Sequence, residues 1–208
     1  MPEALVSHSI DLPSGELRVL QPEEAADLPD RGPVEWAPVA PYWAVLWRSG
    51  VTLARELGGI PLRGRRVVEL GCGLAVPSLA AARGGAAVLA TDASAEALTL
   101  VARSAQANDV RVGTAEVDWT EPDELVKRGP FDLVLAADVL YERASVAPLL
   151  SLLPQLAPEA WIADPGRPAA EAFLEEASRR WRVETGVRGV VRIHRVDLAP
   201  AGPAMRDG

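Results

Sequence analysis

A glycine-rich turn between an apolar segment and a helix-like segment is the part of the sequence best suited to chemistry. Residues 67–75 read VVELGCGLA, in which Gly71 and Gly73 flank Cys72. A glycine lets the backbone approach a ligand that a Cβ atom would exclude. In a doubly wound sheet, a turn after the first strand lies at the carboxyl edge, where ligands bind. We therefore expect the turn to contact a ligand.

Two ligand classes, dinucleotides and S-adenosylmethionine, bind at turns of this kind, and nearby residues distinguish them. A dinucleotide fingerprint has a third glycine three residues after the second, where this chain has Val76. Glu69 precedes the turn and suits a cationic sulfonium and an ammonium group better than a pyrophosphate. Asp92, about twenty residues further on, can accept hydrogen bonds from ribose hydroxyls, which both ligands carry. The pattern favours S-adenosylmethionine; the alternative is that both acids are simply polar strand ends.

Asp118 and Trp119 stand at the end of a third predicted strand. A planar indole there can pack on an adenine ring while the neighbouring carboxylate accepts from the adenine amino group. The alternative is a tryptophan that closes the core, because aromatic residues bury large areas whatever their function. We favour the adenine contact for Trp119 and assign Trp36, Trp161 and Trp181 to packing.

A second apolar segment ends in an acid and an aromatic residue. It reads FDLVLAA over residues 131–137 and is followed by Asp138 and Tyr141. If this strand flanks the first across the point where the strand order reverses, both side chains face the same crevice as Gly71. The two motifs would then form one site.

Residues 164–167 read DPGR and follow the fifth predicted strand, again at the carboxyl edge. Proline and glycine in this order indicate a turn. The alternative is that Asp164 adds a second carboxylate near the acceptor, and the residues leave both interpretations open. Neither His8 nor His194 is assigned a role.

These side chains can meet only if the strands that carry them are parallel neighbours. The predicted strands are 66–70, 86–91, 110–117, 131–136 and 160–163. The predicted helices are 43–57, 76–83, 94–108 with Ser94 as its cap, 123–127, 145–155 and 169–179. The runs 181–188 and 190–198 predict an antiparallel hairpin around Gly189. Alternation of strand and helix requires crossover connections, and hence a mostly parallel sheet with helices on both faces. We expect a doubly wound α/β fold with seven strands.

The first part of the chain departs from this alternation. Residues 10–20 predict two short strands around Pro13, after which prolines interrupt any long helix as far as Pro41. A length of 208 residues with 49% hydrophobic content suits one domain with a full core. We therefore expect an N-terminal extension with a short hairpin over 1–41, followed by one α/β domain over 42–208.

Composition limits the partners and the compartment. The formal charge is −8, and only Lys127 among the 21 basic residues is a lysine, so no basic cluster predicts a nucleic-acid partner. An acidic chain suits a cationic partner such as a lysine-bearing protein, although moderate acidity is also ordinary for solubility. Cys72 is the only cysteine, which excludes an internal disulfide and argues against a zinc site. Without a visible signal sequence or a membrane-spanning run, we expect a cytoplasmic location. We also expect a monomer and, because no ligand cluster is visible, no metal.

The sequence resembles the seven-stranded class I methyltransferases over roughly 41–175, and more narrowly the branch that contains protein lysine methyltransferases. Within that branch it is most similar to enzymes that methylate lysines of the electron-transfer flavoprotein β subunit. Three motifs carry this similarity: Pro41-Tyr42-Trp43-Ala44 with Trp47 and Gly50, Asp138-x-x-Tyr141-Glu142, and Asp164-Pro165-Gly166-Arg167.

The resemblance implies a site with a cofactor half and an acceptor half. It implies S-adenosylmethionine contacts from Trp47, Gly71, Gly73, Asp92, Trp119 and the Ala137 segment, to which the residue types add Glu69, Cys72 and Asp118. It also implies that Asp138 and Tyr141 border the acceptor nitrogen as catalytic residues, with Trp43, Glu142, Asp164 and Arg167 as substrate-binding residues. Ala75 departs from the family pattern, because relatives often carry glycine there; alanine is small enough to preserve binding.

The expected reaction is methyl transfer from S-adenosylmethionine to a nitrogen, leaving S-adenosylhomocysteine. A lysine amine has a pKa of about 10.4 in water and must lose a proton before it attacks. Asp138 can orient the ammonium and Tyr141 can hold the neutral amine. The alternatives are a small-molecule N- or O-methyltransferase on the same fold and, more distantly, an NAD-binding oxidoreductase or a non-catalytic nucleotide-binding module.

Overall fold

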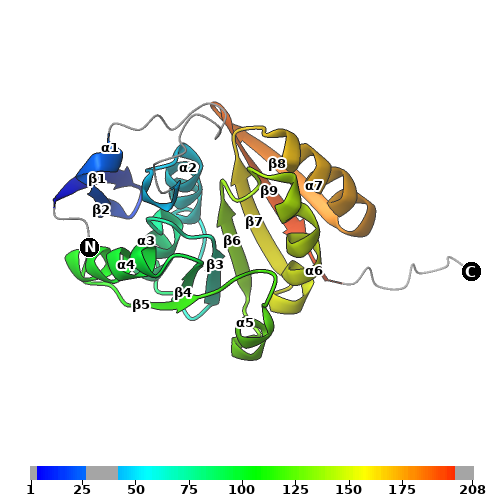
Figure 1. Ribbon diagram of the computed structural model, residues 1–208, viewed down its shortest axis with the longest axis horizontal. Coiled ribbons are helices and arrows are strands. Elements are labelled where there is room, and N and C mark those ends of the chain that lie inside the picture. The colour runs from blue at the N-terminus through cyan, green and yellow to red at the C-terminus, as the bar shows by residue number, and fades with distance from the viewer. Residues whose placement is uncertain (1–3, 27–41, 200–208) are drawn as a thin grey trace, which may run out of the picture.

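Five parallel strands and an antiparallel hairpin form one twisted sheet in the computed structural model, which describes residues 4–26 and 42–199 (Figure 1). The strand order is β5-β4-β3-β6-β7-β9-β8. The strands are β3 (Arg66–Leu70), β4 (Ala87–Asp92), β5 (Val112–Glu116), β6 (Leu133–Ala137), β7 (Glu159–Asp164), β8 (Arg182–Arg188) and β9 (Val191–Asp197). The predicted doubly wound sheet and its C-terminal hairpin are confirmed.

The middle of the sheet is β3, which lies between β4 and β6. Val67 on β3 is in register with Val88 on β4 and with Leu133 on β6. Strands buried on both faces are runs of apolar residues, as β3 and β6 are. The chain moves outward from β3 in one direction, through β4 and β5, and then in the other, through β6 and β7. The order therefore reverses between β3 and β6, where a crevice opens at the carboxyl ends.

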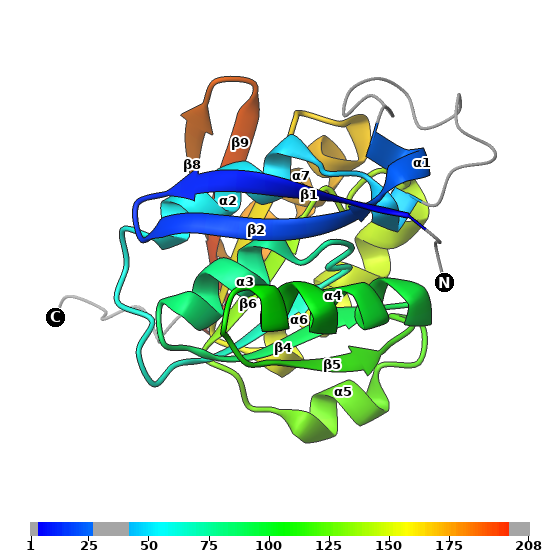
Figure 2. The ribbon, with the colours of Figure 1, turned by 90° about the vertical axis from the view of Figure 1, so that its left-hand side faces the viewer.

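Helices cover both faces of the sheet (Figures 1 and 2). One face packs against α2 (Arg48–Leu57), α3 (Val76–Arg83) and α4 (Ala95–Ala107), and the other against α5 (Asp123–Arg128), α6 (Val146–Leu156) and α7 (Pro168–Arg180). Adjacent residues of β3 show the division, because Val67 packs with Leu53 of α2 whereas Val68 packs with Leu149 of α6. None of the helices in the described part of the chain combines the length and the apolar character needed to cross a bilayer.

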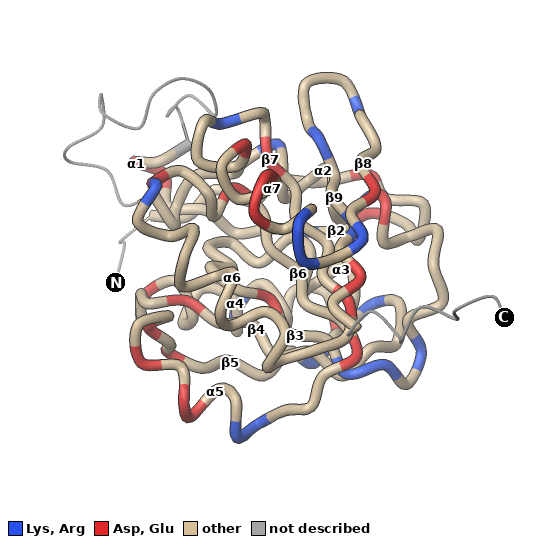
Figure 3. The backbone as a smooth tube through the Cα atoms, turned by 90° about the vertical axis from the view of Figure 1, so that its right-hand side faces the viewer, with Lys and Arg blue, Asp and Glu red and all other residues tan. Residues whose placement is uncertain are grey.

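Charged residues at the end of α7 and a capping residue at the start of α4 stabilise these two helices. In α7, Arg179 and Arg180 lie in the last turn and pair with Glu175 and Glu176 one turn earlier. Figure 3 marks the acidic and basic positions along the backbone. In α4, Ser94 is the N-cap, as predicted, and its hydroxyl accepts from the backbone N–H of Ala97. These ends agree with the predicted bounds to within two residues.

An N-terminal hairpin lies against α3 and α4 as a separate two-stranded sheet (Figure 2). Its strands, β1 (Leu5–Leu12) and β2 (Gly15–Pro22), are longer than the predicted pair over 10–20, and the short helix α1 (Glu23–Ala26) follows. Leu17 is fully buried among residues of α3 and α4. The division proposed at residue 41, the prolines from Pro29 to Pro41 and Trp36 lie outside the described residues.

The segment before α2 is not the helix that its apolar spacing predicts. A short 3₁₀ turn, η2 (Tyr42–Ala44), comes first, and α2 begins only at Arg48. Trp47 has an extended backbone, and its indole N–H donates to the carbonyl of Tyr42 at 3.0 Å. Gln21 of β2 donates to the carbonyl of Ala44, also at 3.0 Å. These bonds hold the segment in a compact non-helical form, which is why the prediction of a helix over 43–57 is wrong for its first five residues.

Candidate active site

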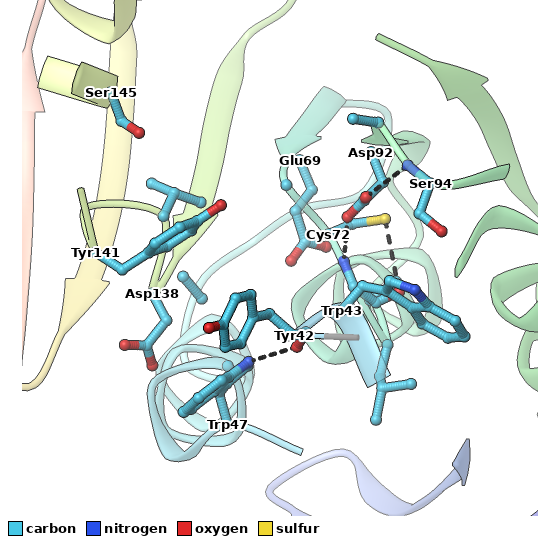
Figure 4. A pocket seen from close by; sticks show the side chains of 18 of the residues that line it. Tyr42, Trp43, Trp47, Glu69, Cys72, Asp92, Ser94, Asp138, Tyr141 and Ser145 are labelled. Atoms are coloured by element: carbon cyan, nitrogen blue, oxygen red, sulfur yellow. Dashed lines mark hydrogen bonds between the residues drawn. The ribbon is translucent and has the colours of Figure 1, made fainter. Parts of the chain in front are cut away.

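A cavity of about 580 Å³ opens at the carboxyl ends of β3, β4 and β6 (Figure 4). This is the size range of small-molecule sites. Thirteen of the fifteen predicted site residues line it: Trp43, Trp47, Glu69, Gly71, Cys72, Gly73, Asp92, Asp118, Trp119, Ala137, Asp138, Tyr141 and Arg167. The structure therefore brings the glycine-rich turn and the Asp138 segment together, as their strand order requires.

The glycine-rich turn has a left-handed backbone at Gly71 and Gly73, with φ of +59° and +49°. The space beside them is occupied by the protein rather than open to a ligand. A Cβ atom on Gly71 would lie 3.0 Å from Val139 and 3.2 Å from Trp119, and one on Gly73 would lie 2.9 Å from the carbonyl oxygen of Trp43. The neighbouring walls of the cavity are thus one reason that these positions lack side chains. Both glycines line the cavity, and their contact with a ligand stays a prediction.

Asp92 joins the ends of β3 and β4. One carboxylate oxygen accepts from the backbone N–H of Gly73 at 2.8 Å and the other from that of Ser94 at 2.9 Å (Figure 4). A carboxylate oxygen can accept more than one hydrogen bond, so Asp92 retains capacity for hydroxyl groups of a ligand. Its partly exposed side chain lines the cavity.

Glu69 lies beneath the turn and is 1% exposed. Its carboxylate accepts from the backbone N–H of Ser78 in the first turn of α3 at 2.8 Å. Burial raises the pKa of Glu69 to about 8, although hydrogen bonding with Ser78 acts in the opposite direction. At neutral pH the acid is therefore largely protonated, and a cation in the cavity would favour its ionised form.

Asp118 and Trp119 close the cavity beyond the turn. Asp118 is exposed and accepts from both the backbone N–H and the hydroxyl of Thr120, which lowers its pKa. Trp119 is half-buried, and its ring lies against Gly71. The ring thus packs against the core and also lines the cavity. The two interpretations of Trp119, core packing and a contact with adenine, are therefore compatible.

Asp138 stands on the opposite wall with a left-handed backbone, φ +58°, and is 7% exposed. Arg167 donates to its Oδ1 atom from Nε at 3.0 Å and from Nη2 at 2.9 Å. Burial raises the pKa of Asp138, although the charge of Arg167 and its hydrogen bonds act in the opposite direction. The guanidinium also lies 5.6 Å from the ring centroid of Trp47.

Aromatic side chains form the mouth on the Asp138 side (Figure 4). The ring centroids of Tyr42 and Tyr141 are 6.1 Å apart, and Trp47 completes this wall. Trp43 lines the cavity on the other side, near Ser94. Tyr141 is 43% exposed, and burial of its hydroxyl raises its pKa above the ordinary value. Tyr42 was not among the predicted site residues, although it stands in one of the three family motifs.

Two predicted substrate-binding residues, Glu142 and Asp164, do not line the cavity. Glu142 is exposed on the loop before α6. Asp164 is 1% exposed and accepts from His194 at 2.8 Å and from the backbone N–H groups of Gly166 and Arg167. Burial alone would raise the pKa of Asp164, but hydrogen bonds from His194 and Gly166 hold this pKa below the ordinary value. Asp164 is therefore not a second carboxylate facing an acceptor, because its polar atoms are already engaged.

Sequence reasoning missed His194, which is fully buried on β9. Its partner Asp164 lies thirty positions away in the sequence, so no local pattern connects the two. A metal site was not expected, and within residues 4–26 and 42–199 no three or more His, Cys, Asp and Glu side chains gather in a way that could hold an ion.

Known proteins match this chain over most of the cavity-forming region. A family model for lysine methyltransferases matches residues 42–162. Protein N-lysine methyltransferase METTL21A of Danio rerio is 34% identical over 119 residues, covering 54% of this chain and 55% of the relative. The electron transfer flavoprotein beta subunit lysine methyltransferase of Xenopus laevis is 34% identical over 143 residues, covering 66% and 55%. The chain thus spans about half the length of these curated relatives.

Among solved structures, a 16S rRNA methyltransferase of T. thermophilus in complex with AdoMet and guanosine superposes with a TM-score of 0.64 at 17% identity. The superposition covers 94% of this chain and 51% of the other. At this identity the similarity shows the fold, which agrees with the strand order described above.

Replacing Gly73 should be far more damaging than replacing Ala75, although both have positive φ. In Gly73→Ala, the new methyl group meets a carbonyl oxygen and the left-handed backbone is strained, so we expect a loss of about 2 kcal/mol or more in the free energy of unfolding. In Ala75→Gly, relief of that strain offsets the loss of a buried methyl group, so the change should stay within about 1 kcal/mol. Urea denaturation measures both, and equal losses would contradict this account.

The raised pKa of Glu69 predicts a pH-dependent difference between the wild type and Glu69→Gln. The unfolded chain releases this proton near pH 4.5 and the folded chain near pH 8, so wild-type stability falls as the pH rises between these values. Glutamine still accepts from Ser78 but does not ionise. Without ligand, the variant should gain on the order of a few kcal/mol relative to the wild type between pH 5 and pH 8. A difference that is constant with pH would refute the raised pKa.

Proposed function

The chain belongs to the lysine methyltransferase family, and from this premise we propose that it transfers the methyl group of S-adenosylmethionine to the side-chain amine of a protein lysine. One observation carries the proposal: a single cavity joins the glycine-rich turn and Asp92 on one wall to Asp138 and Tyr141 on the other. Such a cavity can hold a methyl donor and an amine acceptor side by side. Their alignment supplies much of the rate enhancement of a displacement reaction.

The wall formed by β3, β4 and β5 is suited to S-adenosylmethionine, which supplies a methyl group activated by a sulfonium. Asp92 would accept from its ribose hydroxyls while still holding the backbone of Gly73. Trp119 would lie against the adenine ring. Glu69 is close enough to the turn to favour a cationic ligand over a pyrophosphate, and the positive charge of the ligand would lower its pKa. These roles follow from residue type and position in the cavity.

The opposite wall is suited to an amine. The carboxylate of Asp138 would attract the lysine ammonium and orient it, and the Tyr141 hydroxyl would hydrogen-bond the neutral amine. Tyr42 and Trp47 would exclude water from the amine, and desolvation lowers the pKa of an amine. The acceptor would thus lose its proton to solvent at the mouth before it attacks. Arg167 keeps Asp138 in place for this task.

A protein lysine is the acceptor that the family favours, and the exposed aromatic mouth supports it, because a long side chain can enter while its backbone stays outside. The flavoprotein β subunit is the first substrate to test. The cytoplasmic location, the monomeric state, the lack of a nucleic-acid partner and the independence from metal stay predictions.

Incubation with S-adenosylmethionine that carries a labelled methyl group tests the proposal. The purified enzyme is mixed with the electron-transfer flavoprotein β subunit, and in parallel with a cell lysate separated into proteins and small molecules. We expect label in protein, on a lysine identified by mass spectrometry. Label confined to the small-molecule fraction, or found in neither fraction while the enzyme binds S-adenosylhomocysteine, would contradict a protein lysine acceptor.

Substitutions on the two walls should separate turnover from cofactor binding. In Asp138→Ala we expect turnover to fall by about 100-fold or more, with the affinity for S-adenosylhomocysteine largely retained. In Asp92→Ala we expect the dissociation constant for S-adenosylhomocysteine to rise by about 10-fold or more, because hydrogen bonds to a charged group are lost. Calorimetry and initial rates measure the two effects.

Glu175→Ala, which removes an exposed acid on α7, is the control and should change neither quantity. If Asp138→Ala methylated its acceptor at the wild-type rate, the role given to Asp138 would be wrong. If Asp92→Ala bound S-adenosylhomocysteine normally, the ribose contact would be wrong.

A further inference from the structure

A chain of hydrogen bonds, buried at His194 and Asp164, links the C-terminal hairpin to the edge of the active site. His194 on β9 stands opposite Thr185 on β8, and its Nδ1 atom lies 2.8 Å from the threonine hydroxyl. Its Nε2 atom lies 2.8 Å from the Oδ2 atom of Asp164 at the end of β7. A carboxylate can only accept, so Nε2 carries the hydrogen of this bond. His194 and Asp164 are each 1% exposed.

The other oxygen of Asp164 holds the turn that leads into α7. Oδ1 accepts from the backbone N–H groups of Gly166 and Arg167, and Gly166 has the left-handed φ of +86° that the turn requires. Both oxygens of one carboxylate are thus committed, one to His194 and one to the turn. The position of Arg167 therefore depends on the orientation of Asp164, which His194 fixes.

Arg167 transmits this position to the cavity. Its side chain is 13% exposed and makes two hydrogen bonds to Asp138, while its guanidinium lies over Trp47. The backbone of Asp138 is tied to the same region, because its N–H donates to the carbonyl of Ala163 at 2.9 Å. The segment from Ala163 to Arg167 thus holds Asp138 at both its backbone and its carboxylate.

This arrangement is a poor way to gain stability alone. A buried ion pair often stabilises a fold no better than apolar residues of similar volume, because both charges lose their hydration. Fully satisfied polar networks instead fix one geometry of the groups they join. The group at the inner end of this network is the carboxylate that lines the cavity, so geometry at Asp138 is what the network controls.

We propose that His194 is a positioning residue for methyl transfer: through Asp164 it fixes Arg167, and Arg167 fixes the carboxylate of Asp138 at the acceptor end of the cavity. The inference rests on the proposed function for its effect on turnover. Its structural part, the dependence of Arg167 on His194, can be tested without any acceptor. A small displacement of a catalytic group can lower the rate by up to about 100-fold, so a residue outside the cavity can control turnover.

The test compares His194→Phe, which keeps a ring but removes both hydrogen bonds, with His194→Gln, whose amide N–H can still donate to Asp164. Trp161→Phe is a matched control. Trp161 is a buried aromatic residue on the same pair of strands, opposite Arg195, and loses one hydrogen bond, to Glu159, in the variant. Each variant is examined for thermal stability, for S-adenosylhomocysteine affinity, and for its rate of methyl transfer to the electron-transfer flavoprotein β subunit.

The Nε–H signal of Arg167 in a proton–nitrogen correlation spectrum reports directly on the position of this side chain. It is assigned by its loss in Arg167→Lys, and a purely structural role of His194 would leave it unchanged. In His194→Phe we expect this signal to shift or broaden and methyl transfer to fall by about 10-fold or more, with S-adenosylhomocysteine affinity within about 2-fold of the wild type. In His194→Gln the Arg167 signal and the methyl-transfer rate should return most of the way to their wild-type values. Trp161→Phe should leave the signal and the rate unchanged, although it loses about as much thermal stability as His194→Phe.

An unchanged Arg167 signal and rate in folded His194→Phe would overturn the proposal, as would equal changes in Trp161→Phe. If His194→Phe does not fold, Thr185→Val replaces it. Thr185 is exposed, and its loss frees the imidazole to rotate, so a shifted Arg167 signal supports the network and an unmoved one overturns it. If the wild type binds S-adenosylhomocysteine but methylates no protein, the proposed function fails, while the Arg167 signal still decides whether His194 positions the site.

Discussion

Parallel strands of one sheet all end at the same edge, and each of the five in this protein carries a cavity-side or buried acid within two residues of its end. These acids are Glu69, Asp92, Asp118, Asp138 and Asp164. Carboxylates gathered at one edge repel one another, and those that are buried also lose hydration, so each is stabilised by a partner. The arrangement of the other side chains in the site depends on which group pairs with each acid. The partner determines whether an acid faces the cavity or serves the backbone behind it.

Each acid has a different partner, and its role in the site differs accordingly. Glu69 keeps a proton and holds the start of α3, and Asp92 binds two backbone N–H groups while still lining the cavity. Asp138 meets Arg167, and Asp164 meets His194 and a turn. A ligand with a positive charge would be favoured in such a surrounding, which is the physical reason that a sulfonium donor and an amine acceptor suit one cavity.

Much of the scaffold is predictable from local patterns, because burial on both faces makes β3 and β6 apolar runs and the glycines bound the helices. The bounds of β3 and α3 match the prediction residue for residue. What a single sequence could not reveal is contact between distant segments. Gly73 is glycine because the carbonyl of Trp43 lies beside it, and Asp164 is buried because His194 reaches it from β9. The late start of α2 likewise depends on the bond from Gln21 on the N-terminal hairpin to Ala44.

The most direct test of the account is a crystal of this protein soaked with S-adenosylhomocysteine at saturating concentration. We predict density for the ligand in the cavity, with its ribose hydroxyls on Asp92, its adenine against Trp119, and its sulfur directed toward Asp138. A cavity that stays empty, or a ligand whose ribose lies away from Asp92, would contradict the account.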